Sequence, residues 1–358
     1  MAPTSSRRCG FTGSFRVAKV TPEVSRETCV AVIGGGSWGT TVASLAARNT
    51  PTILYTRRPE TAEEINSEHT NSRYLPGETL DTELRATADL EEAVTRADVL
   101  VMGVPSHGFR ETLAQAAPHI RPWVPIVSLT KGLEQESHYR MTELIEELVP
   151  GHPAGVLAGP NLAKEIVQGY AAAAVLAMPD QSTCTALQRL FNRAAFRVYS
   201  STDVIGVEIA GALKNVFAIS AGMSAGLGTG DNTRALVIAR SLAEMTRLGI
   251  AIGGERHTFA GLAGMGDLLA TCISPLSRNR HVGEELAKGR TIDEITGEMN
   301  MVAEGVKTSK TVMELADQYD IEMPIAREVY AVVNEGRTAQ EAFRGLLRTR
   351  PTTELAAN

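Results

Sequence analysis

A glycine-rich loop between two apolar segments constrains this chain more than any other feature. Gly34, Gly36 and Gly39 fill the pattern G-x-G-x-x-G. The run Cys29–Gly34 before them is short, apolar and β-branched, which predicts a strand, and Val42, Leu45 and Ala46 after them keep helical spacing. A second apolar run, 52–56, follows. Strand, glycine turn, helix and strand form a βαβ unit, so the chain is expected to build a parallel sheet.

The spacing of these glycines suits a dinucleotide. The first allows a tight turn, the second lets a pyrophosphate approach the backbone, and the third packs the helix against the strand. Sites of this kind that select NAD place an acid at the end of the second strand, but here Arg57 and Arg58 stand there and the nearest acid is Glu60. Guanidinium groups suit a 2′-phosphate, so we predict that NADP is accepted and preferred, with NAD as the second cofactor.

Further strands are expected before residue 202. Residues 97–105 and 125–134 each read as a strand, and they deliver Pro105 and Lys131 to the carboxyl edge of the sheet, where ligands bind. Residues 155–166 predict a strand, a loop and a helix that Asn161 could cap, and two last short strands precede 202. From Asp203 onward only helical patterns remain. We therefore predict an α/β Rossmann-like domain with a mostly parallel sheet, followed by an all-α domain.

The domain boundaries follow from these patterns. Residues 29–202 are the predicted dinucleotide-binding domain, 203–347 the helical substrate domain, and 348–358 a flexible tail. Residues 1–28 are arginine-rich, with a composition like that of a transit peptide and an Arg7-Arg8 pair like a twin-arginine signal. No apolar stretch follows that pair, and we expect a disordered extension or an upstream start codon instead of a targeting signal.

Lys214 is the most informative residue of the second half. It is the only charged side chain in 209–230, and its helical neighbours Ala210, Gly211 and Ala218 offer no carboxylate. A lysine so placed is desolvated, which lowers its pKa and suits it to give and take a proton near neutrality. The alternative is a lysine whose stem lies along a buried helix while its ammonium reaches solvent.

Two neighbouring segments supply polar and basic groups. Asp267 follows a glycine turn, with Thr271 one helical turn further on. Ser277 is placed to cap a helix that ends at Gly289 and has Arg278 and Asn279 in its first turn. Because cations there oppose the helix dipole, a bound anion would explain them, although an exposed basic turn without a ligand has the same spacing.

Net charge and cysteine content limit which partners, compartment and kinds of site the sequence allows. The net charge is -6, from 35 Lys+Arg and 41 Asp+Glu, which argues against nucleic acid as a partner and requires local basic clusters for any anion. The four cysteines form no C-x-x-C pair, so we expect a reducing cytoplasmic setting and no metal site. The longest apolar run, 170–178, is shorter than the ~20 residues that span a bilayer, so no membrane span is expected.

Nine motifs in one order carry a family resemblance. From Thr28 to Gly345 the chain closely resembles the bacterial-type NAD(P)-dependent glycerol-3-phosphate dehydrogenases. The motifs are GGGSWGT, VPSHGFR, TKGLE, AGPNLAKE, ALKNVFAI, GDNTRALVI, GLAGMGDLLATC, SRNR and VAEGVKT. The chain departs from the family at Asn161-Leu162, often Ser-Phe, and at Arg58, often acidic.

The resemblance implies an activity and a set of roles. The activity is reversible reduction of dihydroxyacetone phosphate to sn-glycerol 3-phosphate for phospholipid synthesis, and the assembly is a homodimer. The catalytic residues would be Lys214 as general acid/base, Lys131 and Asp267. Cofactor contacts would come from Gly34, Gly36, Ser37, Trp38, Gly39, Arg57, Arg58, Tyr74, Pro105, Lys131, Ala163, Arg278, Val302 and Glu304. Substrate contacts would come from Lys131, Gly159, Asn161, Lys214, Asp267, Thr271, Ser277, Arg278 and Asn279.

Two alternatives stay open on the sequence. A β-hydroxyacid or 6-phosphogluconate-type dehydrogenase shares the two-domain plan and an essential lysine, and a panel of keto substrates would separate it. A non-catalytic NADP-binding sensor would bind cofactor without turnover, but it leaves Lys214 unexplained.

Overall fold

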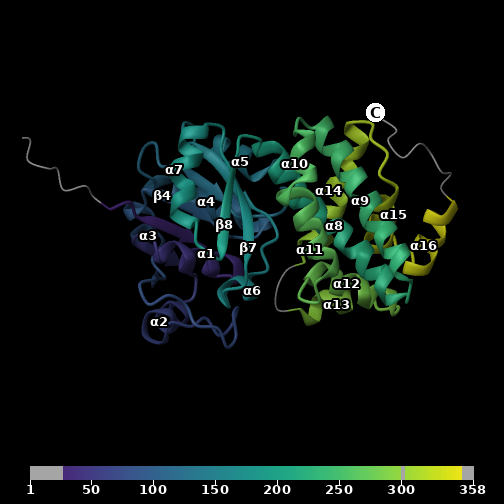
Figure 1. Ribbon diagram of the computed structural model, residues 1–358, viewed down its shortest axis with the longest axis horizontal. Helices are drawn as coiled ribbons and strands as arrows, with labels where there is room; N and C mark the ends of the chain where they lie inside the picture. The colour runs from purple at the N-terminus through teal and green to yellow at the C-terminus, as the bar shows by residue number, and fades with distance from the viewer. Residues whose placement is uncertain (1–26, 300–302, 349–358) are drawn as a thin grey trace, which may run out of the picture.

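The computed structural model describes residues 27–299 and 303–348. Figure 1 shows a sheet flanked by helices joined to a helical bundle. The sheet has the strand order β3-β2-β1-β4-β5-β6-β7-β8. Its strands are β1 Val30–Ile33, β2 Thr52–Tyr55, β3 Arg85–Thr87, β4 Val99–Met102, β5 Ile126–Ser128, β6 Ala154–Ala158, β7 Ala172–Ala177 and β8 Phe196–Ser201. The predicted α/β fold with a mostly parallel sheet is confirmed.

Strands β1 to β6 run parallel, whereas β7 pairs antiparallel with β6 and parallel with β8. All four side chains of β1 are apolar, and they point alternately to the two faces of the sheet. Val30 and Val32 face one core, and Ala31 and Ile33 face the other. Helices therefore cover both sides, as a parallel sheet requires.

One side of the sheet carries α1 Ser37–Ala47, α2 Pro59–Glu68, α6 Ala163–Val167 and α7 Gln181–Phe191, and the other α3 Leu90–Arg96, α4 Ser106–Ala116 and α5 Met141–Leu148. After β8 the described chain is helical: α8 Val204–Gly226, α9 Asp231–Ala251, α10 Arg256–Ala260, the π-helix Leu262–Gly266, α11 Asp267–Ile273, α12 Arg278–Ala287, α13 Ile292–Glu298, α14 Glu304–Gln318, α15 Pro324–Asn334 and α16 Ala339–Arg348.

Helix α8 lies at the centre of this helical part. It packs against α9, α11, α12, α14 and α15, so its side chains are buried on nearly every face. By length and composition α8 could cross a membrane, but 94% of its most apolar window is buried inside the protein. It is therefore a core helix, and it includes most of the helical stretch expected at 209–230.

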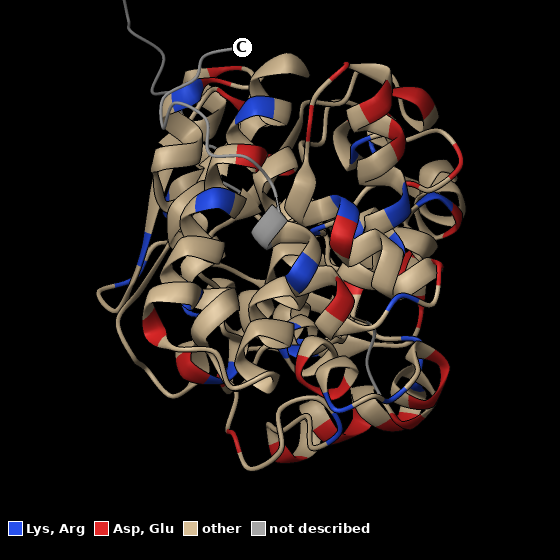
Figure 2. Cartoon of the chain, turned by 90° about the vertical axis from the view of Figure 1, so that its right-hand side faces the viewer, with Lys and Arg blue, Asp and Glu red and all other residues tan. Residues whose placement is uncertain are grey.

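Charged residues occupy the outer surfaces of the helical part. Figure 2 shows acidic and basic residues interspersed over these helices, with tan segments between them. Many of the charges are paired, as Arg337 is with Glu328 and Arg327 with Asp317. Exposed pairs of this kind add at most about 1 kcal/mol each to stability, so they do not explain the fold.

Candidate active site

The carboxyl edge of the parallel strands gathers the sequence-predicted residues. Gly34 follows β1, Arg57 follows β2, Pro105 follows β4, Lys131 follows β5 and Gly159 follows β6. Because these strands are parallel, the residues after their ends share one edge. The helical part brings Lys214 and Asp267 to the same edge, where Asp267 contacts Lys131.

The glycine loop has the geometry of a phosphate cradle. Gly34 has a φ of 125°, and a Cβ on Gly39 would lie 2.0 Å from the Gly34 carbonyl oxygen, so both positions require glycine. A Cβ on Gly36 would meet nothing within 4 Å, which leaves the loop open at the start of α1. The bare backbone N–H groups of this loop and helix fit the pyrophosphate of a dinucleotide.

Two aromatic residues frame this loop. The Trp38 ring packs edge-on against Phe196, with ring centroids 6.2 Å apart, and its buried Nε1 has no hydrogen-bond partner among the described residues. Ser37 donates to the Tyr74 carbonyl at 2.9 Å, which ties the segment carrying Tyr74 to the loop. Arg57 and Arg58 are exposed at the end of β2, and Arg58 lies 3.5 Å from Glu60. An ion pair this exposed leaves the guanidinium available to a 2′-phosphate.

Lys214 and Lys131 meet on one carboxylate. The Lys131 Nζ lies 2.6 Å from Asp267 Oδ2, and the Lys214 Nζ lies 3.2 Å from Asp267 Oδ1. Lys131 also donates to the Gly159 carbonyl at 2.8 Å, and Lys214 donates to the Thr271 hydroxyl at 2.7 Å. The structure thus joins five of the predicted residues into one network.

Burial sets the electrostatics of this network. Lys214 is 5% exposed and Asp267 2% exposed. Burial, with the positive charge of Lys131, lowers the pKa of Lys214 to about 8, while Asp267 acts in the opposite direction. The alternative in which the Lys214 ammonium reaches solvent is therefore wrong. Burial also raises the pKa of the neighbouring Cys272 thiol to about 12, so that thiol stays neutral.

Two asparagines continue the network, one of which the sequence analysis missed. Asn215 donates to the Lys131 carbonyl at 3.0 Å and accepts from Asn279 Nδ2 at 2.9 Å. The Asn279 Oδ1 in turn accepts from the Gly305 N–H at 2.9 Å, at the start of α14. Asn215 follows Lys214 directly in the motif ALKN, and a buried amide beside a buried lysine was the signal that could have found it.

The start of α12 has the predicted cap. The Ser277 hydroxyl accepts from the Arg280 N–H at 3.2 Å, and Val282 and Leu286 lie on the buried side. Burial lowers the pKa of Arg278, and the nearby charge of Glu304 opposes that shift. Arg280 instead bonds the Ile273 carbonyl and Glu284, so it stabilises the local structure.

Glu304 connects the two halves of the chain at this edge. Its carboxylate accepts from the Ser106 hydroxyl at 2.7 Å and from the Ser106 N–H at 3.3 Å, next to Pro105. Ala163 is the first residue of α6. Val302 lies outside the described residues, so its predicted contact is not placed.

One local prediction is wrong. Asn161 does not cap α6, whose N-cap is Leu162 without a side-chain hydrogen bond. Both polar atoms of the Asn161 side chain are buried and have no partner in the part of the chain that the structure describes. The chain leaves β6 through Gly159, at a φ of 144°, and Pro160, and this turn carries Asn161 away from the capping position.

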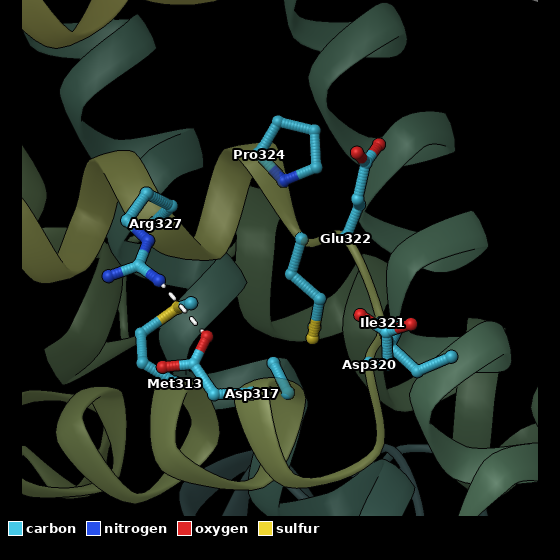
Figure 3. Close-up of a pocket in the computed structure, with 9 residues that line it drawn as sticks. Met313, Asp317, Asp320, Ile321, Glu322, Pro324 and Arg327 are labelled. Carbon is cyan, nitrogen blue, oxygen red and sulfur yellow. Dashed lines mark hydrogen bonds and ion pairs between the residues drawn. The ribbon is translucent and has the colours of Figure 1, made fainter.

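A surface hollow elsewhere contains none of these residues. It measures about 460 Å³ and lies between α14 and α15, lined by Met313, Asp317, Ile321, Glu322, Pro324 and Arg327 among others (Figure 3). Figure 3 shows Arg327 directed at Asp317 across its side. Among the described residues no cluster of His, Cys, Asp and Glu could hold a metal ion.

Comparisons with known proteins give one family. Residues 29–184 match the model of the NAD-dependent glycerol-3-phosphate dehydrogenase N-terminus, and residues 203–344 match that of the C-terminus. A glycerol-3-phosphate dehydrogenase [NAD(P)+] of Mycobacterium avium is 60% identical over 331 residues, 92% of this chain and 97% of the relative. One of Sphingopyxis alaskensis is 61% identical over 320 residues, 89% and 96% of the two chains. The crystal structure of a glycerol-3-phosphate dehydrogenase from Coxiella burnetii has a TM-score of 0.86 at 34% identity, covering 90% of this chain and 99% of that one.

Proposed function

Because the chain belongs to the NAD-dependent glycerol-3-phosphate dehydrogenase family, we propose that it reversibly reduces dihydroxyacetone phosphate to sn-glycerol 3-phosphate with NAD(P)H. The family predicted from the motifs is confirmed, and with it NAD(P) as the cofactor. The observation that carries the proposal is the pairing of buried Lys214 and partly buried Lys131 with Asp267, at the sheet edge that also bears the glycine loop. The product would serve phospholipid synthesis.

Each residue of the network has a proposed task. When bound, the reduced dinucleotide supplies the hydride, and the glycine loop, Ser37, Trp38, Tyr74, Ala163 and Glu304 would hold it. Lys214, protonated at neutral pH because its pKa is about 8, gives its proton to the substrate C2 oxygen and takes it back in the oxidative direction. Lys131 stabilises the developing negative charge on that oxygen.

Asp267 orients both ammonium groups and acts to raise the pKa of Lys214. Two of the three Lys214 N–H bonds go to Asp267 and Thr271. The third is then directed at the substrate. Gly159 and Asn161 complete the wall of the substrate site, and the unpartnered Asn161 amide would bond a substrate hydroxyl.

The phosphate end of the substrate would lie at the start of α12. Arg278, Asn279 and the Ser277 hydroxyl are there, with the helix N–H groups. Binding energy at this end orients the carbonyl for proton and hydride transfer. Arg57 and Arg58 would meet a 2′-phosphate, and on this ground we propose that NADPH is preferred.

The domain limits, the location and the oligomeric state are further parts of this proposal. We infer two functional domains, residues 29–202 and 203–347, since β8 ends at Ser201 and α8 begins at Val204. A cytoplasmic location is supported by Cys184 and Cys272, which are free thiols in the part of the chain that the structure describes. A homodimer remains an expectation from the family. The expected extension 1–28 and tail 348–358 fall almost wholly outside the described residues.

The test is turnover by a lysine variant. Lys214→Ala should lower kcat for dihydroxyacetone phosphate by at least ~10²-fold while NADPH affinity stays within about twofold. Lys310→Ala is the matched control, because Lys310 is an exposed lysine of α14 paired only loosely with Glu314, at 3.8 Å. Full activity in Lys214→Ala would refute the assignment. Activity of the unaltered enzyme on a hydroxy acid instead of the triose would favour the hydroxyacid alternative.

A further inference from the structure

The loop that carries Lys131 is fastened to α8 at both of its ends. This loop, 129–140, leaves β5 and ends at Arg140, the N-cap of α5. Near its start, Asn215 of α8 donates to the Lys131 carbonyl at 3.0 Å. At its far end, Glu208 of α8 accepts from Arg140 at 2.7 Å and from the Thr142 N–H at 3.0 Å. The Thr142 hydroxyl also donates to Glu208.

These contacts come from one face of α8. Glu208, Gly211 and Asn215 stand at i, i+3 and i+7, which is a single stripe of a helix. Between the two fastenings the Lys131 side chain lies against Gly211, where a Cβ would be 3.6 Å from Lys131 Cγ. Lys214 is on the same helix, one residue before Asn215. The position of the loop on α8 therefore sets the position of Lys131 relative to Lys214.

Stability alone does not account for a charged residue at position 208. Glu208 is 5% exposed, and burial raises its pKa, while Arg140 and Thr142 act in the opposite direction. The free energy needed to desolvate two charges offsets much of their attraction. A buried ion pair can therefore commonly be replaced by apolar groups without loss of stability. What the carboxylate adds is geometry, because it accepts three hydrogen bonds from fixed directions.

We propose that Glu208 is a positioning residue: through Arg140 and Thr142 it holds the Lys131 loop on α8, and so fixes the two lysines on opposite oxygens of Asp267. It touches neither substrate nor cofactor. The inference rests on the proposed function, because it takes Lys214 as the group that exchanges a proton with substrate.

Releasing this contact would change the titration of Lys214 in a defined direction. The charged and titratable groups against Lys214 are Asp267 and Cys272 of α11 and Lys131 of the loop. Lys131 lowers the pKa of Lys214, and Asp267 raises it. If the loop moves away, Lys131 withdraws while Asp267, bonded with Thr271 on α11, stays. The pKa of Lys214 should then rise.

The experiment is Glu208→Gln, which keeps the shape of the side chain and removes its charge. We expect kcat for dihydroxyacetone phosphate to fall ~10-fold, because small misplacements of reacting groups cost up to ~10²-fold. The alkaline limb of the kcat profile should move upward by ~0.5–1 pH unit, and the KM for NADPH should stay within about twofold. Because hydration of Lys214 would also raise its pKa, a second buried-glutamate variant is needed to separate withdrawal of Lys131 from general loosening of the fold.

Glu244→Gln is the matched control. Glu244 is also a buried glutamate of the helical part, 1% exposed, and it accepts from the backbone N–H groups of Ile325 and Ala326. None of its described contacts reaches either lysine. Its variant should therefore leave the alkaline limb and kcat in place.

A milder variant covers the case in which Glu208→Gln does not fold. Thr142→Ala removes one donor to Glu208 and should move the limb in the same direction by less, and Thr142→Ser should restore it. An unmoved limb in a folded Glu208→Gln or Thr142→Ala enzyme overturns the positioning role. If the unaltered enzyme lacks the limb, or Lys214→Ala keeps its turnover, the proposed function fails first and takes this inference with it.

Discussion

Removing the charge of Asp267 should shift the pH dependence of kcat to lower pH. It should also affect the reductive and the oxidative direction differently. Asp267 raises the pKa of Lys214, whose Nζ lies 3.2 Å from Oδ1, and Lys131 lowers it. In Asp267→Asn both raising contributions of the carboxylate are lost, while burial and Lys131, which lower the pKa of Lys214, rank above the remaining contribution of Cys272, so that pKa should fall below about 8. The substitution keeps the size of the side chain, and its direction is unambiguous because burial and Lys131 act together.

The size of the shift follows from the geometry. An opposite charge at contact distance moves a pKa by ~1–3 units, so we expect a value near 6 for Lys214 in the variant. At about pH 7.5 the protonated fraction then falls from ~0.8 to ~0.03, which lowers the rate of ketone reduction ~25-fold. In the oxidative direction the neutral amine is the active form, so protonation no longer limits the rate near neutrality.

The assay is a pair of kcat profiles, one for each direction, recorded from about pH 5.5 to 9.5 at saturating dinucleotide. Both limbs assigned to Lys214 should move to lower pH in Asp267→Asn. Asp203→Asn is the control, since Asp203 is a buried carboxylate that accepts from Gly206 and Glu255 N–H groups and has no part in the lysine network. Unchanged limbs in Asp267→Asn would show that Lys214 does not titrate in the reaction, or that Asp267 does not hold its proton.

Two further outcomes follow from charges elsewhere in the chain. Replacing Arg57 and Arg58 together by Gln should raise the KM for NADPH ~10-fold and that for NADH less than about twofold, because only NADPH carries a 2′-phosphate for the guanidinium groups; equal changes for both would contradict that role. Glu244 has a pKa raised by burial to about 7, so its favourable contribution to folding is full below about pH 4.5 and is lost as pH rises through about 7. Thermal unfolding should therefore show the unaltered protein losing stability between these pH values, on the order of 3 kcal/mol, relative to Glu244→Gln.

Local patterns predicted most of the fold and much of the site. Periodicity and glycine spacing sufficed for β1, α1 and β2, because each depends on residues close in sequence. The short edge strand β3, 85–87, escaped prediction because its three residues show no alternation. Nothing local reveals that β7 runs antiparallel to β6, since strand direction depends on the path of the chain and not on the residues of the strand.

The site shows the same division. Lys214 stood out because its charge is isolated in an apolar helix, and Ser277 because caps have a residue preference. Lys131 and Lys214 both contact Asp267, although Lys131 lies 136 positions before Asp267 in the sequence. The roles of Asn215 and Glu208 depend on such distant contacts. Asn161 failed as a cap because the turn at Gly159 and Pro160 determines where its side chain lies.

The burial of α8 has a consequence for the synthesis of the chain. Its partners α9, α11, α12, α14 and α15 all follow it, and the last of them ends at Asn334. At ~5–20 residues per second, roughly a hundred further residues take on the order of ten seconds to be made. For that time the 23-residue apolar helix bearing the lysine lacks part of the helices that cover it in the folded protein. Newly made chains should therefore depend on chaperones that shield this one segment until translation has passed α15.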